Sequence, residues 1–324
     1  MEKYFDVIIT PEKGRNSLFN RAYQIDSSLI QKGNNKQYLG DSNNKICRFC
    51  GKDSTETKFK MKAHIIPEFM GNKFCFSNFE CDNCNQYFGT LEDSLFNLAG
   101  IHNVFSGIKG KKGYPKYKGN KENLTIFAKS QNDIRIQSNK GNDSQTFFFD
   151  KEKERVFVET NQHSFIPQNA FKALVKIGLC MINENELDNY KETLKWINSK
   201  NTTENKNNPF FNVFMNVGGN IRLSKPIAIL LTKRNKADFK NIPEQTLLIS
   251  YGIIKYQIFL PFHLNEKKII SNNDLVFPIE EHLITDTIEN GKITGFKIFK
   301  EQLTGIEKTK ERKHKFNFRF DELK

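Results

Sequence analysis

The hydrophobic positions of the chain change from a strand-like to a helix-like period near residue 165, and this change marks the first predicted elements. Between residues 123 and 160, short runs of β-type residues are separated by clusters of Asn, Asp, Gly and Lys. Such spacing is typical of an antiparallel meander. The runs that predict its strands are LTIFA, DIRIQ, QTFFF and RVFVE.

A helical period begins after Pro167. From Phe171 to Ile182, apolar or small residues recur at steps of three and four, which is one face of an α-helix, and the first turn tolerates the proline. A second helix is marked by Leu187, Tyr190, Leu194 and Ile197. The helices are therefore expected at about 167–197. Strand-like runs return beyond residue 208, so the fold class is predicted to be α+β.

Three segments are expected from these patterns and from the positions of the cysteines. Residues 1–46, which mix one apolar run with a polar Asn- and Lys-rich stretch, predict a loosely structured N-terminal lead-in. Residues 47–98 form a small module that carries most of the cysteines, and residues 99–324 form a larger α+β domain of unknown role. A chain of 324 residues is long enough for such a combination.

The charge balance favours a polyanionic partner. Lys and Arg number 50 against 37 Asp and Glu, which gives a net charge of +13, and binding to phosphates releases counterions. Nucleic acid is the natural candidate. The alternative interpretation is compositional, because Lys and Asn are abundant throughout the chain.

A basic segment at 108–121 is expected to be largely loop, because its lysines are interspersed with glycines. Its lysines would contact phosphates while Tyr114 and Tyr117 stack on bases or sugars. A solvated loop is the alternative, and the same two interpretations apply to the basic tail at 308–319. The candidate nucleic-acid-binding residues are Lys109, Lys111, Lys112, Lys116 and Lys118.

The apolar runs are too short for a membrane span, and the first residues lack the pattern of a secretory signal. We therefore expect a cytoplasmic protein without a membrane partner. In that compartment six cysteines are not expected to form disulfides, and four of them make two C-x-x-C pairs.

These two pairs predict one structural zinc ion. Thiolate pairs of this spacing each hold one edge of a tetrahedral zinc site, here with a 30-residue insert between them. Cys180 lies in the predicted helix and is expected to be a core residue, while Cys75 is an alternative ligand that breaks the paired spacing. The predicted ligands are Cys47, Cys50, Cys81 and Cys84.

The insert and the residues after the second pair carry a further pattern. C-x2-C, then A-H-I-I-P, then C-x2-C-N-x3-G resembles the zinc-stapled branch of the HNH endonuclease family, over residues 47–93. The resemblance implies a ββα-metal module in which a β-hairpin carries His64 and a helix beginning near Asp82 carries Asn85. The full prediction is thus a small zinc-stapled HNH module joined to a larger α+β domain.

The resemblance also implies the chemistry. His64 would be the general base that takes a proton from the attacking water, which suits an imidazole. Asn85 would bind a catalytic divalent ion, Mg²⁺ or Mn²⁺, through its amide oxygen. For His64 the alternative is a histidine that only packs in the module.

Two positions depart from the family pattern. Ala63 stands where relatives commonly place a further metal ligand, so Glu92 or Asp93, seven and eight residues after Asn85, would complete the site. Their alternative role is that of solvated carboxylates, and Glu68 is a weaker candidate. Phe76 stands where the family's middle asparagine ties the loop, and Asn78 is the nearest substitute.

The favoured function is that of a metal-dependent DNA endonuclease gated by its C-terminal domain. Analogy with similar fusions suggests a restriction or anti-phage defence effector. A homodimer would bring two sites to the two strands, and a protein partner would bind the C-terminal domain. The alternatives are a non-catalytic zinc-dependent nucleic-acid-binding protein, which Ala63 favours, and an interaction subunit with a decayed nuclease.

Overall fold

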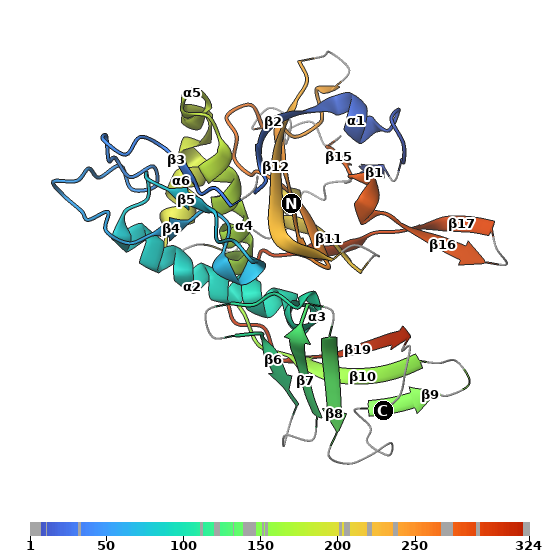
Figure 1. The fold of residues 1–324 in the computed structure, drawn as a ribbon. Coiled ribbons are helices and arrows are strands. Elements are labelled where there is room, and N and C mark those ends of the chain that lie inside the picture. Colours follow the sequence, from blue (N-terminus) through green and yellow to red (C-terminus); the bar gives the residue numbers. More distant parts are fainter. Residues whose placement is uncertain are drawn as a thin grey trace.

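The largest element is an antiparallel sheet of the order β18-β11-β14-β13-β12-β2 (Figure 1). Its strands are β18 (Phe299–Gln302), β11 (Asn212–Val217), β14 (Ile254–Phe259), β13 (Gln245–Gly252), β12 (Leu223–Lys233) and β2 (Tyr23–Leu29). The computed structural model describes residues 8–10, 12–31, 34–110, 113–119, 124–131, 133–138, 147–150, 152, 155–200, 203, 208–218, 222–235, 239–266, 275–289 and 292–319.

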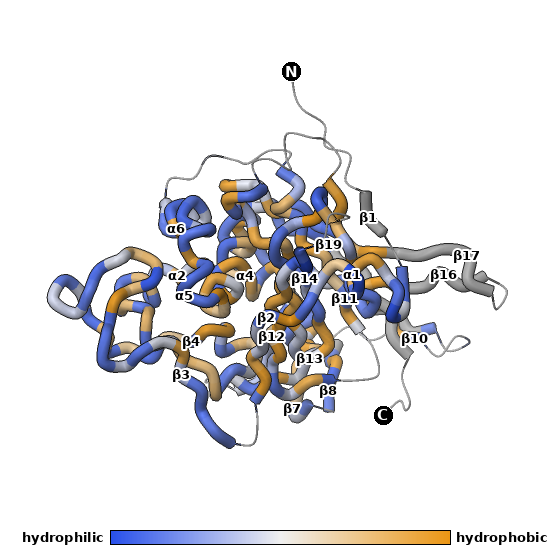
Figure 2. The backbone as a smooth tube through the Cα atoms, turned by 90° about the horizontal axis from the view of Figure 1, so that it is seen from above, coloured by the Kyte–Doolittle hydropathy of each residue, from blue (hydrophilic) through white to orange (hydrophobic). Residues whose placement is uncertain are grey.

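A central helix, α4 (Pro167–Met181), connects this sheet with the cysteine-bearing module. All but two of its residues are buried, as expected of a helix enclosed on all sides. It packs against α2 (Asp82–Ala99), and one hydrophobic core runs through the sheet, α4 and α2. Figure 2 shows hydrophobic segments along α4 and the sheet strands, with hydrophilic loops outside them. The predicted second helix is divided into α5 (Glu184–Leu187), η4 (Asp188–Tyr190) and α6 (Lys191–Asn198).

The module has the predicted ββα order. β4 (Ala63–His64) and β5 (Cys75–Ser77) form an antiparallel pair, with the short helix η1 (Glu68–Met70) between them, and α2 follows. The helix begins at Asp82, as predicted. A parallel strand, β3 (Gln37–Leu39), extends the pair on the other side of β5.

A second lobe lies below the C-terminal end of α2 (Figure 1). The single predicted meander is in fact divided between two three-stranded sheets. Residues 116–118 and, in the basic tail, residues 312–319 were expected as irregular chain but are strands of these sheets. With α3 (His102–Ser106), the lobe encloses a core of its own. The sheets are β6 (Lys116–Lys118), β7 (Leu124–Ser130) and β8 (Asp133–Ser138), and β9 (Phe147–Asp150), β10 (Arg155–Gln162) and β19 (Arg312–Arg319).

The stretch before Cys47 is more ordered than the expected lead-in. It contributes β2 to the large sheet and β3 to the module, because backbone pairing compensates for few apolar residues. It also holds β1 (Ile8–Thr10), parallel to β15 (Val276–Pro278), and α1 (Leu18–Ala22). The remaining elements are η5 (Pro209–Phe211), η7 (Glu281–Leu283), β16 (Thr285–Glu289) and β17 (Lys292–Lys297).

The fold class is therefore α+β, as predicted. Among the described residues, none of the helices has both the length and the apolar character that a membrane crossing requires.

Candidate active site and metal centre

The four paired cysteines gather at one point beside the N-terminus of α2. Cys47 and Cys50 lie on a tight turn that closes with a bond from the Gly51 amide to the Cys47 carbonyl. Cys81 is the N-cap residue of α2, and Cys84 lies in the helix's first turn. The four sulfur atoms lie within 4.8 Å of one another, with Cys50 Sγ and Cys81 Sγ 3.7 Å apart. A tetrahedral zinc with Zn–S bonds of about 2.3 Å separates its sulfurs by roughly 3.8 Å, so the cluster fits a structural zinc.

The pKa values of the thiols in the cluster differ strongly from one another. A hydrogen bond with Cys84 lowers the pKa of Cys47 to about 5, while burial raises the pKa of Cys50 to about 11. The pKa of Cys84 is raised because it shares its proton with Cys47 and faces the other sulfurs. Four sulfurs this close cannot all be thiolates without a cation between them, so bound zinc would remove the conflict.

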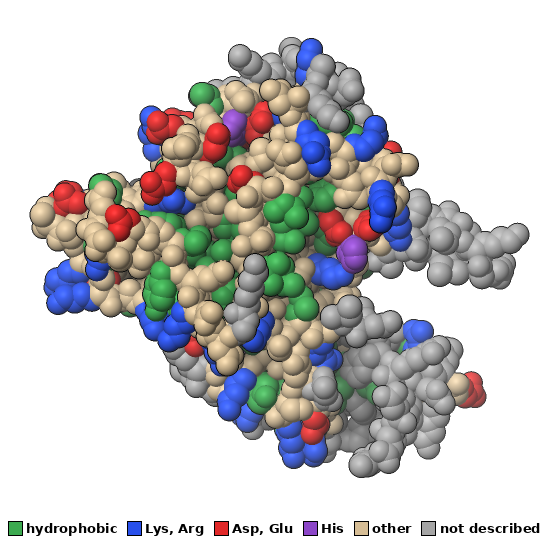
Figure 3. Space-filling view, turned by 45° about the horizontal axis from the view of Figure 1, so that its top comes forward, with side chains coloured by type: hydrophobic (Ala, Val, Ile, Leu, Met, Phe, Trp, Pro, Cys, Tyr) green, Lys and Arg blue, Asp and Glu red, His purple; other side chains and the backbone are tan. Residues whose placement is uncertain are grey.

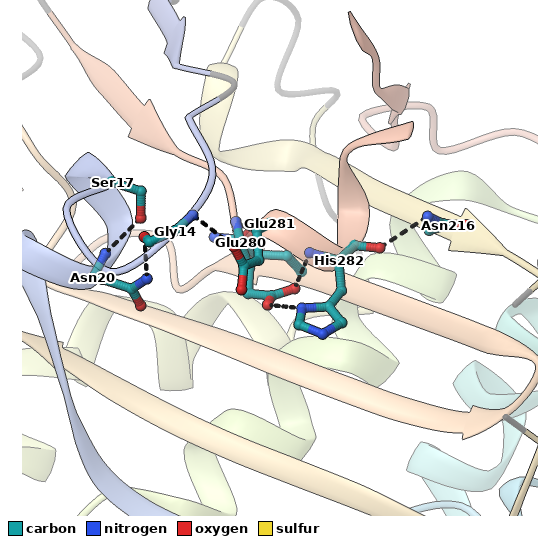
Figure 4. A network of polar contacts seen from close by, with 8 residues as sticks. Gly14, Ser17, Asn20, Asn216, Glu280, Glu281 and His282 are labelled. Atoms are coloured by element: carbon teal, nitrogen blue, oxygen red, sulfur yellow. Dashed lines mark hydrogen bonds and ion pairs between the residues drawn. The ribbon is translucent and has the colours of Figure 1, made fainter. Parts of the chain in front are cut away.

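A second group of possible ligands, Glu280, Glu281 and His282, has a structural explanation (Figure 4). Glu280 accepts bonds from the backbone and the Nδ1 atom of His282, at 2.9 and 2.6 Å, and so caps the short helix η7. Glu281 accepts a bond of 2.7 Å from the Gly14 amide. Glu280 thus stabilises the start of η7, and Glu281 fastens the N-terminal loop at Gly14 to this short helix.

His64 lies on β4 opposite Phe76, with the two rings 5.0 Å apart. Its side chain is 22% exposed, so its imidazole is open to solvent on one side. Its Nε2 atom lies 3.9 Å from Oε2 of Glu68, four residues further along the chain. That carboxylate is placed to stabilise a protonated imidazole.

One stripe of α2 carries the candidate metal ligands. Asn85, Glu92 and Phe96 share it, since they are seven and eleven residues apart on a helix of 3.6 residues per turn. Phe96 packs edge-on against Phe69, with ring centres 5.3 Å apart, so this end of the stripe faces the segment that follows His64. Between Asn85 and Glu92 lies Gly89, and apart from its chain neighbours and the backbone of its own helix no atom is within 4 Å of the place where its Cβ would be. The helix surface between the two candidate ligands is therefore open.

Glu92 is the carboxylate most strongly influenced by this environment. Burial raises its pKa to about 7, Lys176 acts in the opposite direction, and Glu80, Asp93 and Glu68 raise the pKa further. Glu92 thus lies within electrostatic reach of Glu68 and Lys176. Asp93 is exposed, one position further round the helix.

His64, Glu68 and Glu92 are not drawn together as closely as the cysteines. In the described part of the chain, sets of three His, Cys, Asp or Glu ligand atoms within 4.8 Å occur only at the cysteines and at Glu280–His282. Ala63 is buried opposite Ser77, so β4 offers no second side-chain ligand.

The loop between β4 and β5 is tied by Asn72, which the sequence pattern did not single out. Its side chain is fully buried, donates to the carbonyls of Ile66 and Cys75, and accepts from the amides of Phe74 and Cys75. Phe76 packs on His64 instead, and Asn78 donates to the Gly40 carbonyl. The Asn–Lys pair at 72–73 after Gly71 signals a turn, but only the tertiary structure shows which arms it joins.

Replacing Asn72 by Ala is expected to lower the free energy of unfolding by about 2–4 kcal/mol, because several buried backbone groups lose their partners. Urea denaturation measures this value. The matched variant Asn78→Ala should cost about 1 kcal/mol or less, since its side chain makes one exposed bond. Equal costs for the two variants would contradict the assigned role of Asn72.

The basic segment is only partly available to a nucleic acid. Lys109, Lys116 and Lys118 are exposed, and Lys111 and Lys112 lie outside the described residues. The expectation that Tyr117 stacks on bases is wrong, because strand alternation turns its ring into the core of the lobe, where its hydroxyl accepts from the Asn161 amide. In the tail, Arg312 and Lys313 are exposed and paired with Glu301 and Glu159.

The two remaining cysteines are core residues. Cys75 on β5 and Cys180 on α4 are buried, and neither belongs to the sulfur cluster. Burial raises the pKa of each thiol to about 12, which keeps both protonated and unreactive.

Comparison with known proteins agrees with the module's geometry. Residues 47–97 match the sequence model of a family described as HNH endonuclease. The match spans both cysteine pairs, the hairpin and most of α2. No curated protein and no solved structure matches the chain.

Proposed function

Because residues 47–97 belong to an HNH endonuclease module, we propose that the chain is a metal-dependent endonuclease that hydrolyses phosphodiester bonds in DNA. The observation that supports this most is the position of His64. Its partly exposed ring lies on the hairpin, and α2, the helix that carries Asn85 and Glu92 and is open at Gly89, packs through Phe96 against the segment that follows His64. A scissile phosphate would bind between them.

In this reaction His64 takes a proton from the water that attacks phosphorus, and Glu68 stabilises the resulting imidazolium. Asn85 would hold Mg²⁺ or Mn²⁺ through its amide oxygen, and Glu92, two turns further along the helix, would act on the ion through its negative charge. The divalent ion supplies charge stabilisation at the phosphate and the leaving oxygen. A zinc ion on the four cysteines would hold the Cys47–Cys50 turn against the start of α2 and would take no part in the reaction.

The test is incubation of the purified chain with single- and double-stranded DNA and with RNA, in Mg²⁺, Mn²⁺ or EDTA. We expect metal-dependent cleavage of duplex DNA. Cleavage of RNA alone would correct the substrate. Binding without cleavage in every metal would favour the non-catalytic function to which Ala63 points.

Replacing Glu92 by Gln is expected to raise the Mg²⁺ concentration needed for half-maximal cleavage by at least about tenfold, since changes around metal sites commonly cost 10–100-fold in affinity. Cleavage rates across a Mg²⁺ titration measure this. The matched variant Asp93→Asn should behave like the wild type, because Asp93 is exposed beside the stripe. The opposite result would assign the metal to Asp93.

Nucleic-acid binding is proposed to use the outer face of the β6–β8 sheet. Lys116 and Lys118 alternate with buried Tyr117 and so share that face with Arg135 and Phe127. The Lys116 Nζ atom lies 5.9 Å from the centre of the Phe127 ring. Several Lys and Arg side chains are also visible on the lower part of the face in Figure 3.

Reversing both charges, Lys116→Glu with Lys118→Glu, is expected to weaken DNA binding and reduce the slope of log affinity against log salt by about 2, one for each lost phosphate contact. Fluorescence anisotropy at several salt concentrations measures the slope. The control pair is Lys191→Glu with Lys195→Glu, exposed lysines of α6. Equal effects of both pairs would indicate a general charge effect.

We also propose that the C-terminal region controls the nuclease and that the protein has a defence role. The module packs against α4 of the C-terminal region, which gives residues 99–324 a direct means of gating it. A cytoplasmic restriction or anti-phage effector, acting as a homodimer or with a protein partner, fits a gated nuclease. Plasmid restriction in cells that express wild type or His64→Ala tests that role.

A further inference from the structure

Helix α4 carries two buried lysines, and only one of them is directed at the module. The Lys172 ammonium donates to the Ser199 carbonyl at 2.7 Å and lies over the Trp196 ring. The Lys176 ammonium, one helical turn further on, donates to the carbonyl of His64 at 2.5 Å. Both lysines are almost completely buried.

Lys176 also forms an ion pair inside the protein. Its Nζ atom lies 3.1 Å from Oε2 of Glu80, and the two side chains are 2% and 0% exposed. Burial of such a pair costs desolvation energy that hydrophobic side chains of similar size would avoid. The pair therefore contributes little to stability, and its effect is to fix the position of the groups it joins.

The groups joined by Lys176 are the two halves of the candidate active site. His64 lies on β4, a strand of only two residues, so the backbone ladder alone holds it weakly. Glu80 directly precedes Cys81, the N-cap of the helix that carries Asn85 and Glu92. The Lys176 ammonium thus fixes β4, which carries His64, relative to α2, which carries the candidate metal ligands. It does so through a charge-assisted hydrogen bond to the backbone carbonyl of His64 itself.

The module holds α4 in return at the helix's C-terminal end. Arg48, between the first two cysteines, donates from one guanidinium nitrogen to the carbonyls of Leu179, Cys180 and Ile182. A cation at this position satisfies carbonyls that the helix leaves unpaired and offsets its dipole. The side chain of Asn198 donates to the Phe49 carbonyl as well. These contacts fix the position of α4 along its axis, and with it the position of Lys176 relative to the β4–β5 hairpin.

We infer that Lys176 is a positioning residue of the active site, which makes the alignment of His64 with α2 depend on a helix outside the matched segment 47–97. The inference rests on the proposed nuclease function. Its consequence is that displacement of α4 along its axis would move the His64 carbonyl, so this contact links the C-terminal region to the reaction.

The test compares Lys176→Met combined with Glu80→Gln against Lys172→Met. The double variant removes both charges of the ion pair, so no unpaired buried charge is left to unfold the protein. Lys172→Met removes an equally buried ammonium from the same helix but leaves the His64 contact. We expect kcat of the double variant to fall at least about tenfold with KM changed less than about twofold, since misplacement of a catalytic group by about 1 Å can cost a hundredfold.

A second readout is independent of activity. The carbonyl ¹³C resonance of His64 should shift in the double variant and stay unchanged in Lys172→Met. Wild-type kcat in the double variant, or an unshifted resonance, would overturn the inference and leave the nuclease proposal intact. A wild-type protein without cleavage in any metal would overturn the proposed function, and this inference with it.

Discussion

Replacing His64 by Ala is expected to lower the single-turnover rate of DNA cleavage by about 10²–10⁴-fold, the usual contribution of a general base. The side chain is partly exposed and makes its ring contact with Phe76, so its loss removes little packing. The Lys176 contact is to the backbone carbonyl of His64 and remains possible in the variant. The fold, the zinc content and DNA affinity should therefore be retained.

The matched control is His163→Ala, an exposed histidine outside the module. Rates on a short labelled duplex, measured with enzyme in excess, separate the chemical step from binding. A decrease shared by both variants, or a His64→Ala protein that cleaves at the wild-type rate, would show that His64 is not the base.

Replacing Cys81 by Ser is expected to release the zinc and disrupt the module. Structural zinc contributes about 10–16 kcal/mol in zinc-finger peptides, so loss of one of four thiolates removes a large part of the energy that holds the Cys47–Cys50 turn to α2. Cys81 is buried and also begins that helix. Zinc content by elemental analysis and the urea midpoint of unfolding should both fall, and cleavage should be lost with them.

The control for this change is Cys180→Ala, which removes a buried thiol outside the sulfur cluster. It should keep one zinc per chain and cost only about 1 kcal/mol or less through a small cavity. Full zinc content in Cys81→Ser would exclude Cys81 as a ligand.

Features that depend on local pattern could be predicted from the sequence. The cysteine spacing predicted the sulfur cluster, and the resemblance of the A-H-I-I-P run and the second pair to the HNH family implied the ββα order and a helix that begins near Asp82. The period from Phe171 to Ile182 likewise predicted α4. Each of these signals is a short motif or a regular spacing that can be read directly along the chain. The catalytic and metal-binding roles of His64, Asn85, Glu92 and Asp93 remain predictions.

Features that depend on distant partners could not be predicted. Tyr117 was interpreted as a stacking residue, yet pairing of β6 with β7 turns its ring into the core. The strand character of residues 23–29 comes from pairing with β12, some two hundred positions away along the chain. Asn72 and Lys176 carry no motif of their own, and their function becomes visible only when the loop arms and α4 are in place.

The most direct test of the central claim is cleavage of supercoiled plasmid by the wild type and His64→Ala in Mg²⁺ and in EDTA, with zinc measured in the same samples. We expect nicking by the wild type that requires Mg²⁺ and is lost in His64→Ala, with one zinc in both proteins. Cleavage that persists in the variant, or an inactive wild type that nevertheless binds zinc and DNA, would contradict it.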